Sequence, residues 1–282
     1  MEFTRIGNEA VMALGVGTVL SFIAPIILAI IWKVKKKERF STMLIGAATF
    51  IVFALLLEKM IQNVLLFPTQ MMLPNHAVAS FFSTHPFLLA FMVGLFPGVF
   101  EETGRLIAYK VVLKKRKNRE TSISYGIGHG GIEVMLILGL TYIGYLIYAA
   151  AINSGTFSMM VDQIRAQAPD QVETMLALPD QLASISLLTV MGAMVERFFS
   201  VLFHIGASIL VFYACKDQKK FWLYPLAILI HTLMDFVAGL VVLGVMEIPM
   251  IVVEGVIAVF GIVTFGCAYV LLYKKDQKAE NV

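Results

Sequence analysis

The sequence is short of the residues that cover the surface of a soluble protein. Only 15% of its 282 residues are charged, whereas 59% are hydrophobic. Soluble domains are typically about half apolar and about a quarter charged. Cysteine is almost absent too, and Cys215 and Cys267 stand at the end of one apolar stretch and inside another. These shortages argue against a soluble domain and give no sign of a disulfide framework.

What the sequence has instead is long apolar stretches of 20 or more residues. A helix of about 20 apolar residues crosses the ~30 Å hydrocarbon layer of a membrane. The stretches are continuous rather than alternating, which favours helices over a transmembrane β-barrel. The expected fold is therefore all-α, a polytopic transmembrane helical bundle in the cell membrane. Its seven expected segments are residues 9–32, 40–66, 86–113, 122–152, 184–215, 221–246 and 249–273.

Basic residues alternate between the two sides of this bundle. Connections 33–39, 110–119 and 216–220 and the tail after Tyr273 hold 17 of the 22 Lys and Arg residues. Cytoplasmic connections are the ones enriched in Lys and Arg. We therefore expect the N-terminus outside and the C-terminus in the cytoplasm. The net charge of +3 comes mostly from these connections, so it indicates contact with anionic lipid and no nucleic-acid partner.

The connections are too short to hold a soluble domain, so residues 1–282 are expected to form a single integral membrane domain. The longest connection, about 153–183, is expected to be external and amphipathic. Its residues Met175, Leu176, Leu178 and Leu182 suit a short helix at the membrane interface.

Ionisable residues inside membrane helices are costly and by default mark a functional site facing the bundle interior. Glu101, His129, His204 and His231 fall at one common depth, roughly 10–18 Å from the cytoplasmic boundary at ~1.5 Å per residue. Glu101 also has a neighbouring carboxylate, Glu102, and two adjacent carboxylates in apolar sequence have no evident structural purpose. We therefore expect one functional layer in the cytoplasmic half of the bundle.

Several residues of this layer have a potential partner four residues away, on the same helix face. A carboxylate one turn from an imidazole can fix the tautomer and orientation of a catalytic or metal-ligating histidine. The pairs are Glu101–Arg105, His129–Glu133 and His231–Asp235.

Three histidines with one or two carboxylates match a divalent-metal site, such as zinc with an open water position. The metal would lower the pKa of that water while a free glutamate acts as general base. The same residues permit a metal-free mechanism, in which a glutamate deprotonates water and the histidines stabilise the oxyanion. The expected catalytic residues are Glu101, Glu102 and Arg105, and the expected metal-site residues are His129, Glu133, His204, His231 and Asp235.

Other features allow two interpretations. Pro97-Gly98 predicts a kink just before the glutamates. The glycines at 126, 128, 130 and 131 either let helices approach closely or leave room for a substrate backbone. Glu196 and Arg197 form either a structural ion pair or a support for the site. For Glu58, Lys59 and Glu254 we expect a packing or interfacial role.

Four motifs stand in order along the chain: Glu101-Glu102-Thr103-Gly104-Arg105, Tyr125-Gly-Ile-Gly-His129, the isolated His204, and His231-Thr-Leu-Met-Asp235. Together they resemble the CAAX-processing and bacteriocin-processing superfamily of intramembrane endopeptidases. The resemblance is strongest to its YhfC branch, with PrsW and the Aph-type subunit of gamma-secretase as more distant relatives. It covers residues 86–240, about half of the chain, and implies that this part is a four-helix catalytic core.

The resemblance implies proteolysis of a membrane-associated protein or peptide, with a glutamate activating water and the histidines supporting it. The common form of the superfamily has three residues between the second glutamate and the arginine, whereas here there are two, which leaves open which glutamate is the base. Glu133 is an additional carboxylate that suggests a fuller metal shell. Two other functions remain open: a cation or proton transporter that uses the layer as a relay, and a non-catalytic membrane scaffold.

Overall fold

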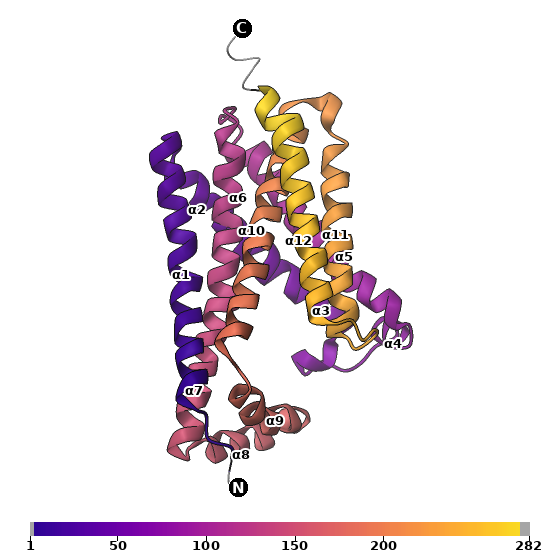
Figure 1. Ribbon diagram of the computed structural model, residues 1–282. Coiled ribbons are helices and arrows are strands. Elements are labelled where there is room, and N and C mark those ends of the chain that lie inside the picture. Colours follow the sequence, from indigo (N-terminus) through magenta and orange to yellow (C-terminus); the bar gives the residue numbers. More distant parts are fainter. Residues whose placement is uncertain (1–2, 277–282) are drawn as a thin grey trace. The chain divides into compact units, whose positions relative to one another are not determined.

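The computed structural model describes residues 3–276, which form helices joined by turns and short connections, without any strand. Seven helical stretches of this described part are long and apolar enough to cross a membrane, which confirms the predicted fold class. The predicted orientation of the termini stays a prediction. The stretches are α1 (Asn8–Lys36), α2–η1–α3 (Phe40–Leu66), α5–η3 (Pro86–Val112), α6–η4–α7 (Glu120–Ser154), α10 (Leu187–Lys216), η6–α11 (Gln218–Val242) and α12–η7 (Met250–Asp276), as Figure 1 shows.

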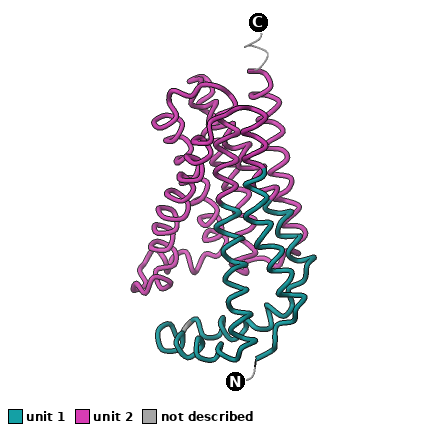
Figure 2. Tube along the Cα trace, turned by 90° about the vertical axis from the view of Figure 1, so that its left-hand side faces the viewer, with its two compact units in different colours: residues 1–27, 133–197 teal, residues 28–132, 198–282 magenta. Residues whose placement is uncertain are grey.

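The described residues fall into two compact units, drawn in teal and magenta in Figure 2. Unit 1 comprises residues 1–27 and 133–197, and unit 2 comprises residues 28–132 and 198–282. Whether they act as one integral membrane domain, as the sequence predicts, stays a prediction.

Unit 1 contains the long connection after α7 (Leu140–Ser154). This connection forms α8 (Phe157–Gln167), the short η5 (Pro169–Gln171) and α9 (Val172–Ala183). The predicted short helix is thus present as α9. Its apolar residues pack on a core that includes Ile6 and Phe157, so part of the amphipathic face covers the protein itself rather than lipid.

Close packing of α5 (Pro86–Ile107) against α11 (Leu223–Val242) organises unit 2, where the two helices run side by side (Figure 1). A Cβ atom added to Gly94 would lie 2.6 Å from the backbone nitrogen of Phe236. One added to Gly98 would lie 2.4 Å from Oγ1 of Thr232. Only glycine permits the two helices to lie this close together. The close approach places the turn of α5 that follows Gly98 beside the residues of α11 that flank Thr232.

Glycines also let α6 (Glu120–Glu133) approach its neighbours in unit 2. A Cβ atom on Gly128 would lie 2.0 Å from the carbonyl oxygen of Met43 in α2 (Phe40–Phe50), and one on Gly126 would lie 2.6 Å from Cα of Ile205 in α10. These contacts are with backbone atoms, which cannot rotate away. The structure therefore supports the packing interpretation of these two glycines, since the space beside them is filled.

Replacing Gly128 by alanine should destabilise the protein by about 1–3 kcal/mol, the usual cost of overpacking a filled interior. Thermal unfolding in detergent measures the effect. Gly266→Ala in α12 (Met250–Ala268) is the matched control, because nothing lies within 4 Å of its added Cβ. Equal unfolding temperatures for the two variants would show that α6 does not need this close contact.

Candidate active site

Three helices of unit 2 bring one carboxylate and two imidazoles together. Glu101 comes from α5, His129 from α6 and His204 from α10, and all three are buried. One oxygen or nitrogen atom from each lies within 4.8 Å of the others. Glu101 Oε2 is 2.8 Å from His129 Nε2 and 3.9 Å from His204 Nδ1. We call Glu101, His129 and His204 the donor group.

The donor group fits a divalent metal by its chemistry. Catalytic zinc sites commonly have three protein ligands, and two imidazoles with one carboxylate is one of the recurring sets. The His129 ring is held by packing, edge-on against Phe50 at 5.2 Å and stacked on Tyr125 at 6.0 Å between ring centroids. Its Nδ1 is buried and has no hydrogen-bond partner among the described residues, so packing and the contact of Nε2 with Glu101 orient this imidazole.

Arg105 lies at the centre of the site and is completely buried. It forms an ion pair with Glu102, and its Nη2 is 3.6 Å from Glu101 Oε2. The same Nη2 donates a hydrogen bond to Nδ1 of His204 at 2.6 Å, since a guanidinium cannot accept one. Arg105 thus faces the very atoms of Glu101 and His204 that the donor group offers.

Replacing Arg105 by alanine should destabilise the protein by about 3–5 kcal/mol, because two carboxylates would be left as buried charges without their cation. Denaturant or thermal unfolding in detergent measures the loss. The control is Lys115→Ala, an exposed residue on the basic connection, with an expected effect within about 0.5 kcal/mol. If both variants unfold alike, Arg105 does not neutralise the glutamates.

A second chain of contacts adjoins the donor group through Arg105. Glu102 is completely buried, and its Oε1 accepts a hydrogen bond from Nδ1 of His231 at 2.8 Å as well as from Arg105. On the other side of the ring, Nε2 of His231 is 3.5 Å from Oδ2 of Asp235. Both nitrogens of His231 therefore face carboxylates. Oε2 of Glu102 is buried and has no hydrogen-bond partner among the described residues.

The structure brings most of the predicted site residues together, although their roles stay predictions. His231 and Asp235 lie beside the donor group rather than in it. Glu133 belongs to unit 1, where its carboxylate is 2.9 Å from Nη1 of Arg197. Arg197 also pairs with Glu196, as one interpretation of the sequence predicts. It therefore contacts two glutamates, where the sequence predicts only one. The residues brought together are Glu101, Glu102, Arg105, His129, His204, His231 and Asp235.

Glu58 is closer to this site than its sequence position indicates. It ends the π-helical turn η1 (Ile51–Glu58), is buried, and pairs with Lys59 at 2.9 Å. It also interacts electrostatically with His231 and Asp235. A packing role was expected because Glu58 lies towards the external side. Asp235 also lies one turn to the external side of His231, so the predicted site already extends towards the depth of Glu58. This shared depth is the sequence signal that could have placed Glu58 near the site.

Comparisons with known proteins agree with the geometry. The family model described as YhfC intramembrane metalloprotease matches residues 20–257. A relative from Bacillus subtilis (strain 168), described as uncharacterized membrane protein YhfC, is 32% identical over 242 residues, which cover 86% of this chain and 89% of that protein. No solved structure matches the chain.

Proposed function

We propose that this chain, which belongs to the YhfC intramembrane metalloprotease family, hydrolyses peptide bonds of membrane-associated proteins or peptides. One observation carries the proposal. The buried donor group, whose ligand atoms lie within 4.8 Å of one another, is beside Glu102, a second buried glutamate whose Oε2 has no hydrogen-bond partner among the described residues. Hydrolysis of an amide needs a basic group for water and a positive charge for the developing oxyanion. The site contains residues for both.

Glu101, His129 and His204 would hold the metal ion. Their two imidazole nitrogens and one carboxylate oxygen are the ligand set of a well-known class of zinc peptidases, so zinc is the ion we propose. A bound zinc ion would polarise the scissile carbonyl and lower the pKa of water. Arg105 faces two of these ligand atoms and also pairs with Glu102, so it would supply positive charge beside the ion.

Glu102 is the residue that we propose as general base. Arg105 and His231 both donate to its Oε1, which leaves Oε2 open to take a proton from water. Asp235 in turn contacts the far nitrogen of His231 and fixes its ring. In this assignment the two adjacent glutamates have different tasks: Glu101 binds the ion and Glu102 moves the proton.

Hydrolysis and ion transport make different predictions for the purified protein. In liposomes, the wild type should cleave members of a broad membrane-peptide library, and cleavage in ¹⁸O-labelled water should place the heavy isotope in the new carboxylate. Mass spectrometry of the products measures both. The proposal is overturned if the wild type cleaves nothing while it conducts ions across the liposome membrane and Glu101→Gln lowers that flux.

A further inference from the structure

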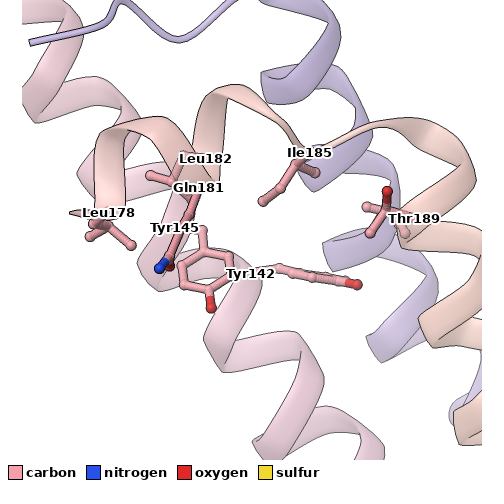
Figure 3. Close-up of a pocket in the computed structure, with 8 residues that line it drawn as sticks. Tyr142, Tyr145, Leu178, Gln181, Leu182, Ile185 and Thr189 are labelled. Carbon is pink, nitrogen blue, oxygen red and sulfur yellow. The ribbon is translucent and has the colours of Figure 1, made fainter. Parts of the chain in front are cut away.

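Unit 1 contains a cavity of about 260 Å³ that shares no residue with the candidate active site. Side chains from α7 face those of α9 and of the start of α10 across it (Figure 3). Tyr142 and Tyr145 line it from α7, and Leu178 and Gln181 line it from α9. Ile185 and Thr189 complete the side towards α10.

The lining combines apolar walls with uncharged hydrogen-bonding groups. It offers two phenol hydroxyls, one amide and one threonine hydroxyl, and no charged side chain. No hydrogen bond within the described residues uses the side chain of Tyr145 or Gln181. Gln181 and Thr189 are exposed and Tyr145 is half-buried, so water can serve these groups while the cavity is open. A ligand that displaces this water must itself offer partners, because leaving polar groups unpaired is costly. The cavity therefore suits a ligand that is apolar in part and carries uncharged donors and acceptors.

The walls of this cavity are held in place without a ligand. A Cβ atom added to Gly17 of α1 would lie 2.6 Å from the ring of Tyr142 and 2.7 Å from Val190, so the α1 backbone fixes both side chains. On the other wall, Leu182 of α9 is fully buried in the core of unit 1. Thr4 further donates a hydrogen bond to Asp180 at 2.8 Å. Such a preformed cavity loses little entropy on binding.

We propose that this cavity binds an uncharged, mainly apolar stretch of a polypeptide, as a substrate-recognition site of the peptidase. The inference rests on the proposed function for the identity of the polypeptide. Peptide N–H and C=O groups would pair with Tyr145 and Gln181 while an aliphatic or aromatic side chain contacts Leu178 and Ile185. A hydrocarbon chain alone would leave those polar groups unpaired, and no cationic side chain is present for a lipid phosphate. The volume is below the ~300 Å³ of typical ligand pockets, which suits one or two side chains.

Cross-linking tests this proposal without relying on cleavage. A photoreactive benzoyl-phenylalanine is placed at Ser184, an exposed residue next to the lining residue Ile185, in a Glu102→Gln background. Met159 of α8, which is 71% exposed, carries it in the matched control. The probe is a biotinylated pool of heptapeptides with blocked termini, composed of Leu, Phe, Ser and Gly. We expect cross-linking at position 184 to exceed that at 159 by roughly tenfold. Tyr145→Phe should weaken binding about three- to tenfold, as loss of one hydrogen bond predicts.

Filling the cavity provides the complementary test. Leu178→Trp should reduce cross-linking at position 184 to the level of the control. Thr189→Trp gives an independent second variant, because Thr189 is exposed and its replacement does not disturb the core. The proposal is overturned if both filled variants bind the peptides as before, or if dodecylphosphocholine occupies the cavity and the peptides do not. Peptide binding without any cleavage by the wild type would contradict only the proposed function, whereas cleavage without binding here would contradict only this inference.

Discussion

Replacing Glu102 by glutamine should abolish peptide cleavage while the protein keeps its metal ion. Glutamine preserves the shape of the side chain and can still accept hydrogen bonds from Arg105 and His231, but it cannot take a proton from water. Loss of a general base typically lowers the rate by about 10²–10⁴-fold. Glu102 lies outside the donor group, so metal content should not change. Product formation in liposomes and elemental analysis of the same preparation measure the two effects.

The matched control is Glu254→Gln, which makes the same chemical change at a half-buried glutamate of α12 outside the site. Its cleavage rate and metal content should both equal those of the wild type. If Glu102→Gln cleaves at the wild-type rate, Glu102 is not the base. If Glu102→Gln loses its metal together with its activity, the separate tasks assigned to Glu101 and Glu102 are wrong.

Replacing His129 by alanine should remove the metal and the activity together. His129 contributes one of the three donor atoms in the group, and its loss leaves only Glu101 and His204 there. Losing even an outer partner of a metal ligand weakens binding about 10–100-fold, so losing a ligand should weaken it by more than about 100-fold. Metal retained after dialysis, and competition with a chromophoric zinc chelator, measure the affinity.

His85→Ala controls for this prediction, since His85 is an exposed histidine just before α5. This variant should keep both its metal and its cleavage rate. Undiminished metal content in His129→Ala would place the ion elsewhere in the protein. Cleavage by a metal-free His129→Ala protein would instead favour the metal-free mechanism that the sequence leaves open.

The spans could be predicted from the sequence because the hydrocarbon layer itself requires about 20 apolar residues per helix. Their ends were less accurate. The fifth span begins at Leu187 rather than 184, because the residues just after α9 form a turn. The sixth ends at Val242 rather than 246, since Gly244 has a φ of 64° and leaves the helix. These ends depend on local backbone conformation, which hydropathy does not report.

Depth in the membrane and spacing along each helix indicated which site residues meet, but they did not identify every side-chain partner. Glu101, His129 and His204 lie on different helices at one depth, and the structure brings them together. The spacing of four residues also suggested that Glu133 supports His129, yet its carboxylate pairs with Arg197, 64 residues away in sequence. Spacing identifies the face of one helix. It does not give the rotation of that helix against its neighbours, which packing decides.

The central claim is that hydrolysis depends on a metal ion held by Glu101, His129 and His204. The most direct test measures peptide cleavage by wild-type protein in liposomes after its metal is stripped with a chelator, and again after zinc is added back. Cleavage should disappear on stripping and return with zinc in the wild type, and it should not return in His129→Ala. Undiminished cleavage by fully metal-free wild-type protein would contradict the claim.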